Sequence, residues 1–63
     1  MKDIKKLREE RGLSRSSLAE KSGLSPSLIG KLEKGQVQSP SLYTLIQLAE
    51  GLGVGIEYLL EDG

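Results

Sequence analysis

The chain has 63 residues, 37% of them hydrophobic, which is enough for one domain with a small core. It contains no cysteine and no histidine, which excludes disulfides and thiolate metal sites and removes the commonest general base and metal ligand. Its nine basic and nine acidic side chains cancel to zero net charge. No stretch resembles a signal peptide or reaches the roughly 20 apolar residues of a membrane span.

The spacing of apolar residues predicts five helices and no strand. The first helix covers roughly residues 2–11, with Ile4, Leu7 and the stem of Arg8 along one face. Gly12 follows as a stop signal, because glycine commonly terminates helices.

Two short helices separated by a glycine come next. Ser14 is a suitable N-cap for a helix over about residues 15–22, and Gly23 ends it with the positive φ that glycine adopts without strain. Ser25 caps the following helix, expected over about residues 26–34. The inward-facing side chains of the pair are expected to be Leu18, Ala19, Ile29 and Leu32.

A polar loop over residues 36–40 leads to a fourth helix. This helix begins near Ser41, or it has Ser39 as its cap and Pro40 in its first position, where a missing N–H costs nothing. Its apolar stripe is expected to be Leu42, Leu45, Ile46, Leu48 and Ala49.

The last predicted helix is short and covers about residues 55–61. Gly51 and Gly53 are expected to separate it from the fourth helix. Its inward residues are expected to be Ile56, Leu59 and Leu60. With no internal repeat, linker or low-complexity segment, residues 1–63 are expected to form a single all-α domain.

The charges are distributed unevenly along the chain. All nine Lys and Arg residues lie at or before Lys34, so residues 1–34 carry a net +4 and residues 35–63 a net −4. A basic half joined to an acidic half can steer one face toward phosphate, whereas ordinary uneven surface charge is the alternative.

The segment from Ser14 to Gly35, SRSSLAEKSGLSPSLIGKLEKG, is the pattern of a helix-turn-helix, whose second helix can enter the major groove of DNA. Beyond this motif, the chain resembles the Cro/phage-repressor-like (xenobiotic-response-element) helix-turn-helix family over residues 4–60. The matching stretches are LREERGLSRSSLAEKSGLSPSLIGKLEKG, SPSLYTLIQLAEGLGV and IEYLL.

That resemblance implies a compact five-helix, lambda-repressor-like domain that binds duplex DNA, often as a two-fold dimer on a palindromic site. It implies a cytoplasmic transcriptional regulator that represses by occlusion or activates. The short chain also fits an excised or engineered DNA-binding domain.

The outer face of the third helix carries the candidate base contacts. Ser27, Lys31 and Lys34 follow an i, i+4, i+7 spacing and therefore share a face. Lys31 can donate to guanine O6 and N7 in the major groove, although a solvated polar stripe is the alternative. The candidate base contacts are Ser25, Pro26, Ser27, Leu28, Gly30 and Lys31.

Three residues of this helix leave alternatives open. Leu28 either packs against the second helix or touches a thymine methyl group. Gly30 costs about 0.5–1 kcal/mol relative to alanine, so it either permits close approach to DNA on the face of Lys31 or is a tolerated weak position. Glu33 departs from the basic trend and is expected to pair with a cation on a neighbouring helix.

Candidate phosphate contacts flank the third helix. The start of the second helix offers free N–H groups and a positive dipole end. The family commonly has glutamine where Arg15 stands. The arginine keeps a phosphate contact plausible but puts a glutamine-mediated bridge to the third helix in doubt. The candidate phosphate contacts are Ser14, Arg15, Ser16, Lys34, Gln36, Gln38, Ser39 and Ser41.

The remaining basic residues of the first helix are ambiguous. Arg8 and Arg11 either contact phosphate or form surface salt bridges with neighbours such as Glu9 and Glu10. Because the loop has no Lys or Arg after Lys34, we expect few ionic contacts and a shallow salt dependence of DNA binding.

The resemblance further implies a two-fold contact through the fifth helix and the loop before it, where Val54, Glu57 and Tyr58 are the candidate dimer contacts. One expectation is that the two copies associate only when both are bound to DNA. We expect no enzyme activity, cofactor, metal, small-molecule ligand or membrane partner, because the carboxylates form no recognisable catalytic set and GLGVG does not follow a strand. The alternative function is an antitoxin-like or adaptor module that binds protein rather than specific DNA.

Overall fold

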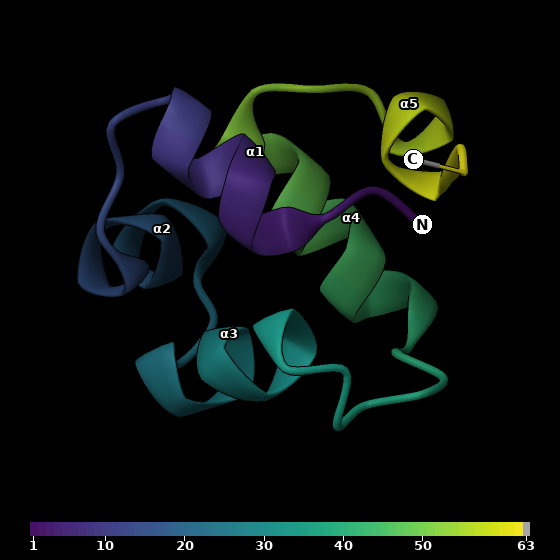
Figure 1. Ribbon diagram of the computed structural model, residues 1–63, viewed down its shortest axis with the longest axis horizontal. Coiled ribbons are helices and arrows are strands. Elements are labelled where there is room, and N and C mark those ends of the chain that lie inside the picture. Colours follow the sequence, from purple (N-terminus) through teal and green to yellow (C-terminus); the bar gives the residue numbers. More distant parts are fainter. Residues whose placement is uncertain (63) are drawn as a thin grey trace.

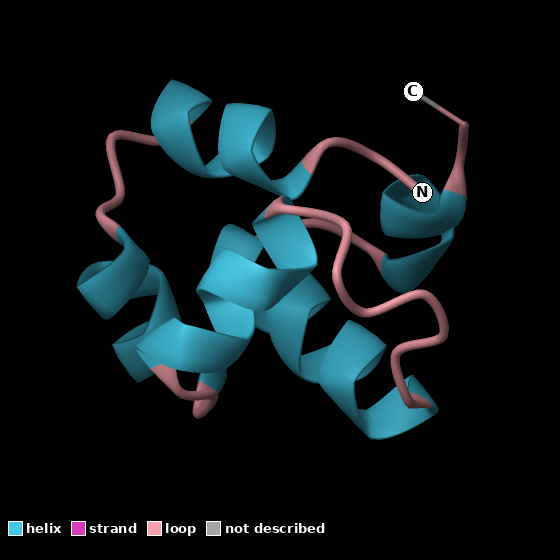
Figure 2. Ribbon diagram, turned by 60° about the horizontal axis from the view of Figure 1, so that its bottom comes forward, coloured by secondary structure: helices cyan, strands magenta, loops and turns pink. Residues whose placement is uncertain are grey.

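Five helices pack around one core in the computed structural model, which describes residues 1–62 (Figure 1). They are α1 (Ile4–Glu10), α2 (Arg15–Ser22), α3 (Pro26–Glu33), α4 (Leu42–Leu52) and α5 (Ile56–Leu60). Turns and loops join them, and the described part of the chain contains no strand (Figure 2). The predicted all-α fold is confirmed.

Serine side chains begin three of the helices. Ser14, Ser25 and Ser41 each accept a hydrogen bond from the backbone N–H three residues further on, over 3.0–3.1 Å. Each bond satisfies one of the free N–H groups at a helix start. Ser41, not Ser39, is therefore the cap of α4.

A glycine with positive φ follows each of the helices α1 to α4, but the predicted stop at Gly51 is wrong. Gly23 and Gly53 follow α2 and α4 with φ of 70° and 72°, a conformation that favours glycine. Gly51 instead lies inside α4, where a Cβ would come within 2.8 Å of the Cβ of Ser22 in α2. The glycine lets these two helices approach closely, so its role is packing.

The core takes one face of every helix. Leu18, Ile29, Leu48 and Leu59 have no exposed surface. The full set of buried apolar residues is Ile4, Leu7, Leu18, Ala19, Ile29, Leu32, Leu48, Ala49, Leu52 and Leu59. The core thus holds α2 and α3 against α1, α4 and α5, leaving the far side of α3 exposed.

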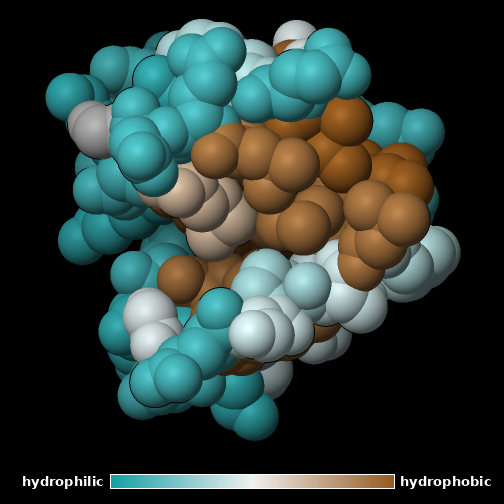
Figure 3. All heavy atoms as spheres, turned by 90° about the vertical axis from the view of Figure 1, so that its right-hand side faces the viewer, coloured by the Kyte–Doolittle hydropathy of each residue, from teal (hydrophilic) through white to brown (hydrophobic). Residues whose placement is uncertain are grey.

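Three residues predicted to face inward are exposed instead. Leu42 and Ile46 of α4 are 65% and 40% exposed, and Leu60 of α5 is 49% exposed. Periodicity marks apolar positions, but a domain this small lacks the elements to cover both sides of α4 and α5. Figure 3 shows an apolar surface on the side of the molecule that carries α5 and the beginning of α4.

The beginning of the chain is attached to α5. The backbone N–H of Lys2 donates a hydrogen bond to the carbonyl oxygen of Leu59 over 2.9 Å. The described residues at the beginning of the chain lie beside α5, on the side of the molecule opposite α2 (Figure 1). Within residues 1–62, none of the helices combines the length and apolar character needed to cross a membrane.

Candidate nucleic-acid interface

The outer surface of α3 is polar and basic. Ser27, Lys31 and Lys34 are exposed, whereas Ile29 and Leu32 on the opposite side are buried. The shared face that the i, i+4, i+7 spacing predicts is therefore present. Its contact with base edges stays a prediction.

The first turn of α3 divides its residues between structure and surface. Ser25 and Pro26 are exposed, and the Ser25 hydroxyl oxygen accepts from the N–H of Leu28 over 3.1 Å. Leu28 is half-buried and packs against the core. Its packing against α2 and its contact with a thymine methyl group both stay predictions.

Gly30 does not share the exposed face of Lys31, so that part of the expectation is wrong, whereas a base contact at Gly30 stays a prediction. The residue is buried, because the guanidinium of Arg15 lies above it. A Cβ at Gly30 would meet Nη1 of Arg15 at 3.9 Å, which is ordinary van der Waals contact. A base contact at Gly30 would require the Arg15 side chain to move.

Glu33 joins three helices through its carboxylate. Its side chain is 1% exposed. Arg8 of α1 donates from Nε to Oε2 over 2.6 Å and from Nη2 to Oε1 over 3.3 Å, and Arg15 of α2 donates from Nε to Oε1 over 3.0 Å. The prediction that Glu33 pairs with a cation on a neighbouring helix is confirmed, and it pairs with two.

These ion pairs change the pKa of Glu33. Burial opposes ionisation of the carboxyl group, but the hydrogen bonds and positive charges of Arg8 and Arg15 outweigh it and hold the pKa of Glu33 below its ordinary value. The hydrogen bond to Glu33, against the opposing effect of burial, raises the pKa of Arg8. The cluster is therefore ionised at neutral pH.

Arg15 bridges α2 to α3 without the glutamine that the family commonly has. The sequence puts a glutamine-mediated bridge in doubt, but the ion pair between Arg15 and Glu33 connects the same two helices. The Arg15 side chain is still 44% exposed, so it lies at the surface beside α3. Its contact with phosphate stays a prediction.

Arg8 and Arg11 serve the fold, which neither sequence-based alternative anticipates. Arg8 is buried and also donates from Nη1 to the carbonyl oxygen of Leu13 over 2.8 Å. Arg11 donates from Nε to the carbonyl oxygen of Leu52 over 2.6 Å, at the end of α4. Surface salt bridges of Arg8 and Arg11 with Glu9 or Glu10 are absent from residues 1–62.

The other candidate phosphate contacts lie around α3. The loop after α3 lies on the opposite side of that helix from α2 (Figure 1). All of these side chains belong to exposed residues, namely Ser14, Ser16, Lys34, Gln36, Gln38, Ser39 and Ser41. The hydroxyl oxygens of Ser14 and Ser41 already accept the capping hydrogen bonds of α2 and α4. A phosphate contact by either hydroxyl would be made in addition to its capping bond.

The candidate dimer contacts do not share one environment. Val54 is half-buried and packs against the core, whereas Glu57 and Tyr58 are exposed. The ring of Tyr58 lies under the Nζ of Lys2, 4.6 Å from the ring centroid. A self-contact would therefore rest mainly on Glu57 and Tyr58.

Comparison with known proteins gives consistent matches. A family model described as Helix-turn-helix matches residues 4–59. The HTH-type transcriptional regulator SutR of Escherichia coli K12 is 43% identical over 51 residues, which cover 81% of this chain and 28% of SutR. SinR of Bacillus subtilis 168, also an HTH-type transcriptional regulator, is 36% identical over 59 residues, which cover 94% of this chain and 53% of SinR. The chain thus spans about half or less of the length of these curated relatives.

Solved structures of SinR share the fold. The crystal structure of SinR in complex with DNA superimposes with a TM-score of 0.84 at 36% identity and covers 92% of both chains. The complex of SinR with SinI gives a TM-score of 0.86 at 36% identity and covers 94% of this chain and 57% of that one.

Proposed function

The chain belongs to the Helix-turn-helix family over residues 4–59, and from this membership we propose that it binds specific duplex DNA and regulates transcription. The observation that carries the proposal is the outer face of α3, where Ser27, Lys31 and Lys34 are exposed together. A helix held by a helix-turn-helix and exposing such donors fits the major groove. SinR, a regulator of the same fold, has been crystallised with DNA.

In the proposed complex, α3 lies in the major groove with Lys31 and Ser27 directed at base edges. The start of α2 and the loop after α3 contact the phosphates on either side, which sets the register of α3 in the groove. The regulator would repress by occluding its site, and it would act in the cytoplasm of a bacterium like its relatives. We propose no catalytic activity for this domain.

The experiment is a selection over random duplexes followed by fluorescence anisotropy at two salt concentrations. We expect a selected duplex to outcompete bulk DNA. Lys31→Glu should abolish this binding, whereas Lys21→Glu, an equal charge change at an exposed position of α2, should preserve specificity. If no duplex outcompetes bulk DNA, the proposal of specific binding is wrong.

A protein-binding module is the second candidate function. The apolar surface over α5 and the beginning of α4, with Leu42, Ile46 and Leu60 exposed, favours it (Figure 3). A structure of SinR in complex with the protein SinI has been solved. Lys31→Glu separates the two functions, because it should leave a protein contact on this surface intact.

A further inference from the structure

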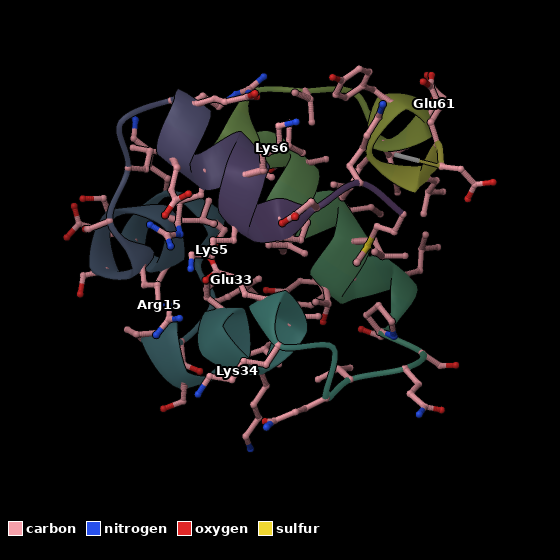
Figure 4. All side chains as sticks on the ribbon, in the orientation of Figure 1. Lys5, Lys6, Arg15, Glu33, Lys34 and Glu61 are labelled. Carbon is pink, nitrogen blue, oxygen red and sulfur yellow. The ribbon has the colours of Figure 1, made fainter. Side chains whose placement is uncertain are left out.

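Lys5 lies on the same side of α1 as Arg8, and this placement brings it to the edge of the basic surface around α3. Residues three apart on a helix share a face, and Arg8 reaches Glu33 of α3 from that face. Figure 4 shows the Lys5 side chain on the edge of α1 that faces Glu33 and Arg15.

The positive charge of Lys5 is not cancelled by the nearest buried acid. Glu33 is already held by Arg8 and Arg15, two guanidinium groups for one carboxylate. Lys5 is exposed, and it takes part in none of the ion pairs found within residues 1–62. Lys5, Arg15 and Lys34 are thus three cations around the buried carboxylate of Glu33 (Figure 4). Of the three, Arg15 alone is paired with an acid within residues 1–62.

The neighbouring Lys6 has a different environment. Its backbone N–H donates to the Asp3 carboxylate, and its side chain borders a hollow with Glu10 and Tyr58 on the α5 side of α1. Successive helical residues point about 100° apart, so Lys5 and Lys6 face different parts of the surface. Two adjacent lysines therefore differ mainly in the direction they face.

We propose that Lys5 is a further phosphate contact, which extends the DNA-binding surface from the helix-turn-helix onto α1. The inference rests on the proposed DNA binding and adds a residue outside the motif. Lys5 and the exposed Arg15 would hold the DNA strand on the α2 side of the groove, through charge alone and without reading sequence. Glu9, one turn after Lys5, weakens this attraction but does not pair with it.

The test is the salt dependence of binding to a 30-base-pair duplex of mixed sequence, because phosphate contacts do not require the specific site. Affinities are measured by anisotropy between about 50 and 200 mM salt for the parent chain, Lys5→Gln and Lys6→Gln. Loss of one phosphate contact lowers the slope of log K against log salt by about 0.9. We expect that decrease for Lys5→Gln and an unchanged slope for Lys6→Gln, with circular dichroism matching the parent for both.

Two results overturn the inference, and they are distinguishable. If the parent binds and the two variants give equal slopes, Lys5 makes no specific phosphate contact and the proposed function stands. If the parent fails to bind any duplex even at low salt, the proposed function falls and the role of Lys5 falls with it.

Discussion

Arg15 donates a hydrogen bond from its Nε to Oε1 of Glu33 over 3.0 Å, and so ties the first residue of α2 to the last residue of α3. The two helices of the motif are thereby joined at the surface as well as in the core. Arg8 holds the same carboxylate from α1, so one buried charge fixes the relative position of three helices.

Replacing Glu33 should therefore destabilise the whole domain. Glu33→Gln leaves Arg8 buried without its counter-charge, and breaking a buried pair in this way costs about 3–5 kcal/mol. Arg15→Gln should cost less than about 1 kcal/mol, because Arg15 is 44% exposed. Urea unfolding followed by circular dichroism measures both, and equal losses would show that Glu33 does not act through Arg8.

The free energy of unfolding should fall in acid because of the same carboxyl group. The pKa of Glu33 is lower in the folded chain than in the unfolded chain, so in the pH window between them the unfolded state binds more protons and stability rises with pH. The stabilisation is present above the ordinary glutamate pKa and is lost as pH falls through the folded value. Urea titrations from pH 7 to pH 3 should show this slope, and Arg15→Gln should make it shallower. An identical slope in that variant would contradict the assignment to Glu33.

Two helical glycines should respond oppositely to the same substitution. Gly30→Ala should stabilise the fold by about 0.5–1 kcal/mol, because the new methyl group meets only Arg15 at ordinary distance. Gly51→Ala should destabilise it by about 1–3 kcal/mol, because its Cβ would lie 3.2 Å from the Cα of Ser22 as well as against its side chain. The midpoints of urea unfolding should rise for Gly30→Ala and fall for Gly51→Ala relative to the parent chain. A shift in the same direction for both variants would contradict the prediction.

The Gly30→Ala chain also tests the candidate base contact at that position. If α3 needs close approach to DNA there, affinity for the selected duplex should fall while stability rises. Unchanged affinity would show that Gly30 serves packing under Arg15 and not recognition.

We expect two copies of the chain to associate only on DNA. Sedimentation equilibrium should give the 6.8 kDa monomer in free solution and two chains on a selected palindromic duplex. Tyr58→Ala should reduce cooperative binding to that duplex, whereas Tyr43→Ala, at the other exposed tyrosine, should not. A stable dimer in free solution would contradict binding-linked assembly.

Local signals in the sequence predicted the fold well. A serine cap or a turn glycine acts through hydrogen bonds and φ values a few residues away, so Ser14, Ser25 and Gly23 could be assigned directly. Gly51 could not, because its role depends on Ser22 of another helix.

The charged residues show the same limit. The spacing on α3 predicted which side chains are exposed, and the position of Glu33 predicted that it pairs with a cation. Its two partners lie 25 and 18 residues away, so they could be identified only once α1, α2 and α3 had been placed together. The spacing of α1 predicted that the stem of Arg8 faces inward with Ile4 and Leu7, but nothing local in the sequence indicated its ion pair with Glu33.

The hydrogen bond between Lys2 and Leu59 has a practical consequence for anyone who wishes to modify this protein. This bond holds the beginning of the chain against α5, on the side of the molecule away from α2 (Figure 1). A fluorophore, affinity tag or second protein fused to the beginning of the chain would emerge beside α5 and leave the outer surface of α3 clear. Joining residues 2 and 60 by a short linker would likewise close the chain into a ring.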